Sequence, residues 1–354
     1  MKSYVHGGDV YRHPGVLDFS ANINPLGTPP GVIRAARDSM ERIRCYPDAS
    51  QETLRRQLAK ELQVREDWLI FGNGAAELIF ALAGAVKPRQ ALVFAPSFAE
   101  YEQALKAADC QIHRFFLKEE EGFVPGEAPL EEIRRLADTL DLVFLCNPNN
   151  PTGVLTDPGM LRKIADFCRE AGILLTVDEC FLDFVREPQK HTLKDLLPDH
   201  GNLFLLRAFT KTYAMAGLRL GYGICSDPEV LLRMEMRLQP WNVSIPAQEA
   251  GIAALREGEF VDRARRLVFE ESAFLKAELE KLGYHVFASQ ANYLFFKGED
   301  WLGEALLEEK IMIRDCSNYP GLSGGFWRIA VKTHEENQRL LEAVGKVREA
   351  WQKR

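Results

Sequence analysis

The sequence predicts an α/β fold, with a mainly parallel central sheet flanked by helices and a smaller α+β domain. The first observation is a series of continuous apolar runs, which suit strands buried on both faces of a parallel sheet. These runs cover residues 69–71, 91–95, 142–146, 173–179, 203–209 and 220–225. The second is the helical spacing of apolar residues at 161–172, between two of the runs. The third is the length of 354 residues, which predicts two packed units.

The chain divides into an arm and two predicted domains. Residues 1–30 are rich in Gly, Pro and Asn, and predict an extended N-terminal arm, without a packed element of its own, that lies on the rest of the protein. Residues 50–239 contain the apolar runs and form the predicted large domain. Residues 31–49 and 240–354 form the predicted small domain, with a boundary near QPWNVS. Its shorter strands are expected at 292–297, 311–316 and 326–332, before a closing helix from residue 334.

Composition and charge disfavour several classes of protein. The formal charge of -7 gives no basic surface of the kind that nucleic-acid binding requires. The seven cysteines are scattered and lack C-x-x-C spacing, so we expect reduced thiols and no metal site. The N-terminus lacks the apolar core of a signal peptide, and no apolar run approaches the roughly 20 residues that span a bilayer. A cytoplasmic protein is the expectation.

The strongest single motif is AFTKTYAMAGLRLGY at 208–222. It follows an apolar run and contains Lys211, Arg219, Gly217 and Gly221. A lysine at the carboxyl end of a buried strand is partly desolvated, which favours the neutral amine and a nucleophilic role toward an aldehyde. The arginine supplies a fixed charge for a phosphate, and the glycines permit close backbone approach. For either charged residue alone, an exposed surface side chain is the alternative.

A carboxylate ends another apolar run, ILLTVDE at 173–179. Asp178 lies there at the end of an almost wholly apolar strand, where an unpaired charge is costly and a cationic partner is expected. A protonated pyridine nitrogen is one such partner, because it can accept the electrons released when a bond to a substrate Cα breaks. A helix cap or a loop salt bridge is the alternative.

Two turns also follow apolar runs. NPNNPTG at 147–153 forms a tight turn that can direct Asn150 toward the strand ends, as a donor to a phenolic oxygen. GNGAAE at 72–77 opens a helix, so the backbone N–H groups of Gly74, Ala75 and Ala76 predict an anion site for a phosphate. Helices in α/β folds also begin this way without binding a ligand.

The order of these motifs along nearly the whole chain resembles the class I/II aminotransferases, which are pyridoxal 5'-phosphate (PLP) enzymes of fold type I. The resemblance implies that Lys211 binds PLP as a Schiff base and is the catalytic residue. It implies further that Asp178 holds the pyridine nitrogen, that Asn150 contacts O3', and that Arg219 with residues 74–76 holds the phosphate. Ala208 replaces a hydroxyl residue of the family, so Thr210 is expected to supply that phosphate contact.

Two aromatic residues are also implied by the resemblance. Phe98, in APSFAEY, matches the aromatic residue that stacks on the cofactor ring; a core phenylalanine at a helix start is the alternative. Tyr46, in CYPD, resembles the tyrosine that reaches the cofactor phosphate of the neighbouring subunit. It therefore implies a homodimer with shared sites, although the YPD sequence alone indicates only a turn.

Two arginines interrupt apolar strands of the predicted small domain. They are Arg314 in IMIRDC and Arg328 in FWRIAV. Guanidinium groups that point inward need anions, and their bidentate geometry suits carboxylate or phosphate. The resemblance implies that Arg328 binds the substrate α-carboxylate and that Arg314 binds a substrate phosphate. A strand-edge arginine facing water is the alternative for Arg314.

The substrate is indicated by the arm, HGGDVYRHPGVLDFSANINPLGTP at 6–29. It resembles the N-terminus of the L-threonine O-3-phosphate decarboxylases of cobalamin biosynthesis, as does IRDCSNYPGL at 313–322. This resemblance implies decarboxylation to (R)-1-amino-2-propanol O-2-phosphate. The residues implied to contact the substrate are His6, Gly7, Gly8, Asn22, Asn150, Arg314 and Arg328. A functionless tail is the alternative for the arm.

Three further observations bear on the alternatives. Histidinol-phosphate aminotransferases are the other similar family, and the same two arginines would serve transamination. Phe181 departs from their pattern, since those enzymes have a tyrosine that donates to O3', whereas a phenyl ring cannot donate. A PLP-sensing regulator would need an additional DNA-binding domain, and the fold begins within the first tens of residues.

Overall fold

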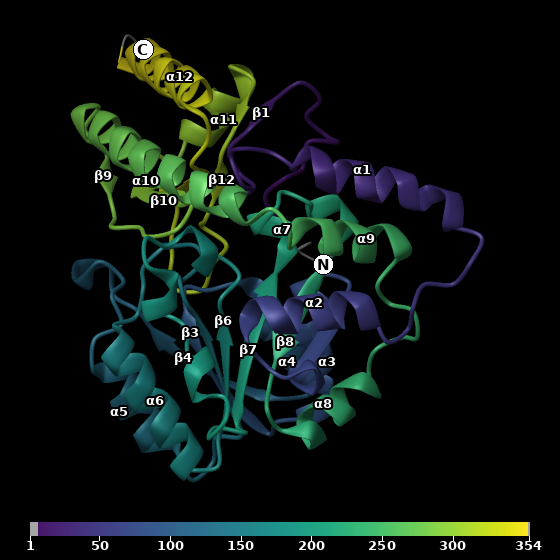
Figure 1. The fold of residues 1–354 in the computed structure, drawn as a ribbon. Helices are drawn as coiled ribbons and strands as arrows, with labels where there is room; N and C mark the ends of the chain where they lie inside the picture. The colour runs from purple at the N-terminus through teal and green to yellow at the C-terminus, as the bar shows by residue number, and fades with distance from the viewer. Residues whose placement is uncertain (1–5, 353–354) are drawn as a thin grey trace.

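The computed structural model describes residues 6–352. A seven-stranded sheet forms the lower half of the molecule in Figure 1, and a smaller unit with α10, α11 and α12 lies above it. In spatial order the strands of the large sheet are β2 (Leu69–Gly72), β8 (Gly221–Ile224), β7 (Leu203–Ala208), β6 (Leu174–Asp178), β5 (Leu142–Cys146), β3 (Gln90–Ala95) and β4 (Gln111–Phe116). Only β8 runs antiparallel to its neighbours. The predicted mainly parallel sheet is confirmed.

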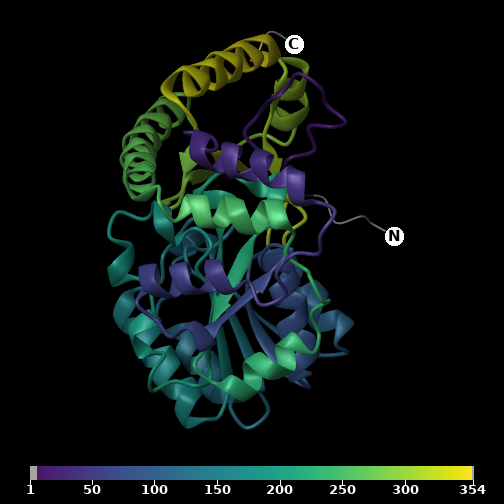
Figure 2. The same ribbon diagram turned by 45° about the vertical axis from the view of Figure 1, so that its right-hand side comes forward.

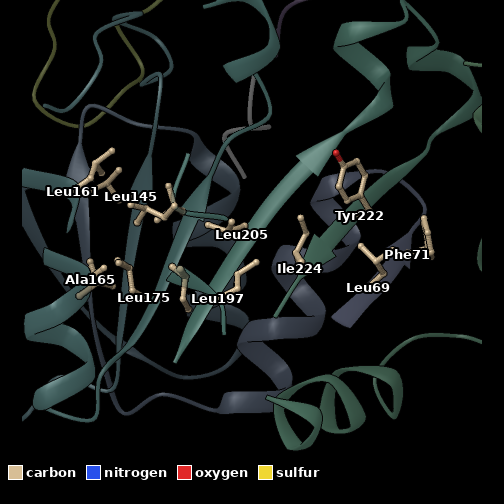
Figure 3. Close-up of a cluster of buried hydrophobic side chains, with 14 of the residues drawn as sticks. Leu69, Phe71, Leu145, Leu161, Ala165, Leu175, Leu197, Leu205, Tyr222 and Ile224 are labelled. Carbon is tan, nitrogen blue, oxygen red and sulfur yellow. The ribbon is translucent and has the colours of Figure 1, made fainter. Parts of the chain in front are cut away.

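Helices cover both faces of this sheet, because successive strand residues alternate between two apolar clusters. Leu175 and Val177 of β6 belong to one cluster and Leu174 to the other. Figure 3 shows part of the first cluster, with Leu205 and Ile224 between the sheet and its helices. The helices around the sheet are α2 (Glu52–Leu62), α3 (Ala75–Val86), α4 (Ala99–Ala107), α5 (Ala128–Leu136), α6 (Pro158–Glu170) and α8 (Pro228–Glu235).

The smaller unit is built on a four-stranded antiparallel sheet. Its strands are β12 (Arg314–Asp315), β13 (Phe326–Ala330), β10 (Tyr293–Lys297) and β9 (His285–Val286). The helices beside it are α10 (Gly258–Lys281), α11 (Leu302–Glu308) and α12 (His334–Gln352). A separate apolar cluster packs these helices against the sheet, so this unit has a hydrophobic core of its own. The predicted smaller α+β unit is therefore present.

Helices α1 (Pro30–Asp38) and α9 (Ile245–Ala254) lie side by side over the large sheet (Figure 2). Val32 of α1 and Ala250 of α9 belong to the apolar cluster of that sheet. The division of the chain at residue 240 stays a prediction, and this packing favours a boundary after α9.

Three local expectations differ from the structure. The arm contains a packed strand, β1 (Leu17–Asp18), which pairs with β11 (Ile311–Met312) because the fully buried Phe19 anchors the segment after it. The run at 311–316 is not one strand: β11 pairs with the arm, and β12 pairs with β13. The sequence prediction also missed β4, an edge strand whose side chains are mostly exposed or half-buried and therefore lack an apolar run. None of the helices in residues 6–352 is long and apolar enough to cross a membrane.

Candidate active site

A cavity of about 320 Å³ opens at the carboxyl ends of the parallel strands, below the small sheet. Parallel strands end at the same edge, so the turns after β5, β6 and β7 meet there. Most of the predicted site residues line this cavity: His6, Gly7, Asn22, Ala75, Ala76, Phe98, Asn150, Asp178, Thr210, Lys211, Arg219, Arg314 and Arg328. Gly8, Gly74 and Tyr46 are not among the lining residues. The sequence therefore predicted a set of residues that the fold gathers in one place.

Lys211 lies on α7 (Phe209–Thr212), the single helical turn that follows β7. Its Nζ is 6.0 Å from the ring centre of Phe181, so a phenyl ring faces the lysine. Burial lowers the pKa of Lys211 to about 8, with the positive charge of Arg328 as the next cause. A substantial fraction of the amine is therefore neutral near pH 7 to 8, as a nucleophile for an aldehyde requires.

Asp178 is buried at the end of β6 and has two hydrogen-bond donors that carry no charge. The Tyr101 hydroxyl donates to its Oδ2 at 2.6 Å, and the backbone N–H of Cys180 donates to Oδ1 at 2.9 Å. Burial raises the pKa of Asp178, because these two donors do not fully replace water. A ligand with a cationic ring nitrogen would compensate this carboxylate, which fits the cofactor better than a loop salt bridge does.

The turn from β2 into α3 forms an anion cradle. Gly74 has φ +82°, and a Cβ there would lie 2.3 Å from Nη2 of Arg219. A Cβ on Gly221 would lie 2.4 Å from the backbone nitrogen of Ala75. Both positions therefore require glycine, and the arginine lies against the first turn of α3 only because they are glycines. A guanidinium beside a helix N-terminus is chemically suited to a phosphate.

Other predicted cofactor residues complete the wall. Phe98 caps α4 and packs its ring edge-on against Tyr101, with 5.7 Å between ring centres. Asn150 is buried, and its Oδ1 accepts a hydrogen bond from Nη1 of Arg328. Its amide N–H groups are thus the part of the side chain that can donate to a ligand. Thr210 is buried beside the cavity and offers a hydroxyl.

Arg314 and Arg328 lie directly opposite each other on the antiparallel strands β12 and β13. Their exposed fractions are 6% and 5%. Nη2 of Arg328 donates to the carbonyl oxygen of Ser20 at 2.9 Å, whereas its Nε has no hydrogen-bond partner among the described residues. Nη2 of Arg314 donates to Oδ1 of Asn318 at 2.9 Å. Two buried like charges on one cavity indicate an anionic ligand.

The N-terminal arm crosses this cavity and is fixed by Ser20. The backbone N–H of Gly8 donates to the Ser20 hydroxyl at 2.7 Å, and a Cβ on Gly7 would lie 2.2 Å from the Ser20 carbonyl oxygen. Asn22 is buried, and its Oδ1 has no partner within residues 6–352. A cavity-lining polar atom in that state is available to a ligand.

Sequence reasoning missed several lining residues. They are Ser20, Ala21, Glu100, Cys146, Cys180 and Tyr319. Glu100 and Tyr319 lie inside APSFAEY and IRDCSNYPGL, so the motifs contained them without indicating a role. Tyr46 is 76% exposed and stacks on Trp241, with 4.3 Å between ring centres. It therefore contributes nothing to this cavity.

The lysine, the buried carboxylate and the anion cradle fit PLP through its aldehyde, ring nitrogen and phosphate. They define a PLP-dependent enzyme of fold type I. No group of three or more His, Cys, Asp or Glu side chains in the described part of the chain is placed to hold a metal ion.

The chain belongs to the aminotransferase class I and II family, whose model matches residues 14–344. It is 40% identical to a threonine-phosphate decarboxylase of Salmonella typhimurium, over 97% of this chain and 96% of that protein. It is 31% identical to an adenosylcobalamin biosynthesis bifunctional protein of Leptospira interrogans, over 94% of this chain and 39% of that protein. The structure of a histidinol-phosphate aminotransferase from Clostridium acetobutylicum matches with a TM-score of 0.87 and 29% identity, over 95% of this chain and all of that one.

Proposed function

We propose that this chain is a PLP-dependent carboxy-lyase that converts L-threonine O-3-phosphate to (R)-1-amino-2-propanol O-2-phosphate, for cobalamin biosynthesis. The observation that carries the proposal is the buried pair Arg314 and Arg328, opposite each other on one cavity. L-threonine O-3-phosphate presents a carboxylate and a phosphate in one molecule, so it satisfies both. The 40% identity to a threonine-phosphate decarboxylase and the resemblance to the cobalamin protein support the proposal.

Each anionic group of the substrate has its own partner. Arg328, fixed by Asn150 and Ser20, binds the carboxylate, and Arg314 binds the phosphate. His6, Gly7, Gly8 and Asn22 of the arm cover the substrate and limit access of water to the site. Together these contacts hold the Cα–carboxylate bond in the orientation from which it breaks.

Other residues of the cavity would hold the cofactor. Asp178 would keep the ring nitrogen protonated, Asn150 would donate to O3', and Phe98 would stack on the ring. The phosphate would be held by Gly74, Ala75, Ala76, Thr210 and Arg219. When bound, the cofactor supplies an electron sink for the pair left on Cα as carbon dioxide departs.

Lys211 has two tasks in this scheme. As a neutral amine, which its lowered pKa provides, it would hold the cofactor through the aldehyde group. Its amine would also lie next to the reacting carbon and donate a proton to Cα, where the carboxylate has left. One proton is consumed for each carbon dioxide released, and no amino acceptor is needed.

We also propose a cytoplasmic homodimer. Tyr46 and Trp241 form an exposed aromatic pair, and Met40 and Ile43 are exposed apolar residues in the same stretch of chain. In a dimer, Tyr46 of each subunit would reach the cofactor phosphate of the other. All seven cysteines are free, and five of them are buried, which fits a reducing compartment.

The proposal is tested by incubating the PLP-loaded protein with L-threonine O-phosphate and no amino acceptor. Mass spectrometry should detect the amine product, and Lys211→Ala should remove it. Transamination of histidinol phosphate with 2-oxoglutarate is the second candidate, which the match to the Clostridium enzyme favours. The two arginines would serve both reactions, because histidinol phosphate has a phosphate and 2-oxoglutarate has carboxylates, so the products decide between them. Amino transfer without amine product would support that candidate instead.

A further inference from the structure

Glu100 is an acidic group in the cavity that the chemistry above does not use. It lies in the first turn of α4, two residues after Phe98, and its side chain is 13% exposed. Its Oε2 is buried with no hydrogen-bond partner in residues 6–352. Its Oε1 lies 3.4 Å from Nε2 of His6. A buried carboxyl with one free oxygen on a substrate cavity needs a partner or a proton.

The contact between His6 and Glu100 joins two separate segments that line the cavity. His6 belongs to the arm, which Ser20 holds at Gly8, whereas Glu100 belongs to the large domain. The other charged or titratable groups that face Glu100 come from four places: Asp178 on β6, Lys211 on α7, Arg314 on β12 and Tyr319 in the turn after it. No hydrogen bond between Glu100 and these four groups is present in the described chain, so His6 is its partner at short range.

Burial determines which member of the pair holds a proton. It raises the pKa of Glu100 to about 7. Burial, and then the charge of Arg314, lowers the pKa of His6. Near pH 7 a proton bound to the pair is therefore held by the carboxyl and not by the imidazole, so the protonated pair carries no charge.

We propose that Glu100 is a positioning residue for the substrate phosphate. Its carboxyl transfers a proton to His6 when an anion enters between His6 and Arg314. The O–H bond of the carboxyl breaks and an N–H bond forms at Nε2, so the imidazolium donates through Nδ1 to the phosphate. The new carboxylate holds the imidazolium from the other side. No other reactant is required, and the phosphate adds a second contact to the arm, which Ser20 already holds at Gly8.

The inference rests on the proposed function in one respect, the assignment of the substrate phosphate to Arg314. The proposed proton transfer makes the affinity for phosphate depend on whether the pair of His6 and Glu100 carries a proton. Above pH 7 the carboxyl has lost its proton, so binding requires proton uptake and affinity falls. Without the carboxyl, the proton must come from solvent to an imidazole whose pKa is already lowered, so the fall begins at lower pH.

The experiment is calorimetric titration of the PLP-loaded protein with inorganic phosphate between pH 5.5 and 9. We expect Glu100→Gln to weaken binding about 10-fold to 100-fold at pH 7, as loss of a charge-assisted hydrogen bond does. We also expect the fall of affinity to move to lower pH in this variant. Inorganic phosphate changes its own protonation state in this pH range, but this effect is the same for all variants and cancels when their affinities are compared as ratios. Glu120→Gln, at an exposed position, is the matched control and should change neither quantity.

A double-mutant cycle shows whether His6 and Glu100 act together or independently on phosphate binding. His6→Gln and Glu100→Gln should each weaken phosphate binding, and the double variant should be no weaker than the worse single variant. Additive losses, or an unchanged pH profile in Glu100→Gln, would overturn the inference, as would wild-type protein that does not bind phosphate. If phosphate binding behaves as expected but wild-type protein releases no carbon dioxide from L-threonine O-phosphate, the proposed function fails and the inference stands.

Discussion

Arg314 lies directly opposite Arg328 across the antiparallel pair β12 and β13, and both guanidinium groups line one cavity. Like charges at directly opposed positions destabilise a sheet, and burial increases that cost. A substrate with two anionic groups offsets this repulsion. The arginine pair is therefore explained by ligand binding and not by a contribution to the stability of the fold.

Arg314→Gln should reduce affinity for L-threonine O-phosphate about 100-fold, because a buried charge-assisted contact to phosphate is worth about 1.5–3 kcal/mol or more. The affinity for L-threonine, which has no phosphate, should change less than threefold. Competitive binding to the PLP-loaded protein measures both. Equal losses for the two ligands would show that Arg314 supports the whole site and does not select the phosphate.

Gly74→Ala should weaken cofactor binding about 10-fold to 100-fold, since a Cβ at this left-handed position would displace Arg219. Gly84→Ala is the matched control on the same helix, where a Cβ meets only the Arg237 side chain at 3.9 Å. That control should leave cofactor affinity unchanged and stabilise the protein by about 0.5–1 kcal/mol. Fluorescence titration of the cofactor-free proteins with PLP and denaturant unfolding provide the two measurements.

Phe181→Tyr should lower the pH midpoint of the visible absorbance change of the bound cofactor by about 0.5 to 1 unit. A tyrosine hydroxyl would donate to O3' and favour the deprotonated neighbouring nitrogen, and one hydrogen bond is worth about 0.5–1.5 kcal/mol. The phenyl ring faces Lys211 from 6.0 Å, so the new hydroxyl would lie at the cofactor. A midpoint that stays within 0.1 unit would contradict this placement.

The rate at which PLP-free protein attaches the cofactor should depend on the pH through Lys211. Its pKa is lowered to about 8, so the reactive neutral amine increases about tenfold per pH unit below pH 8 and reaches a plateau above it. Stopped-flow absorbance at constant ionic strength measures this rate. A rate that still rises between pH 9 and 10 would mean that burial does not lower the pKa of the amine.

Much of the fold was predictable because a sheet buried on both faces leaves continuous apolar runs. The runs at 142–146 and 203–209 correspond to β5 and β7 within one residue at their ends. Strand β4 left no such run, because its residues are partly exposed. The strands β11 and β12 could not be separated, since their assignment depends on the partners, the arm and β13.

The candidate site was predictable where its residues lie at, or just after, the carboxyl end of an apolar strand. Asp178 ends one parallel strand, and Lys211 and Asn150 follow two others, so the topology brings the three residues together. Glu100 was not predictable, because its significance depends on the arm that places His6 3.4 Å away. Local sequence contains no record of that contact, which joins segments more than 90 residues apart.

Decarboxylation is tested most directly by following L-threonine O-phosphate, labelled with ¹³C in its carboxylate, in D₂O without any amino acceptor. We expect one labelled carbon dioxide for each amine formed and one deuteron at Cα of 1-amino-2-propanol phosphate. Both products should disappear with Lys211→Ala. Retention of the label in substrate, together with amino transfer from histidinol phosphate to 2-oxoglutarate, would contradict this expectation and identify the chain as an aminotransferase.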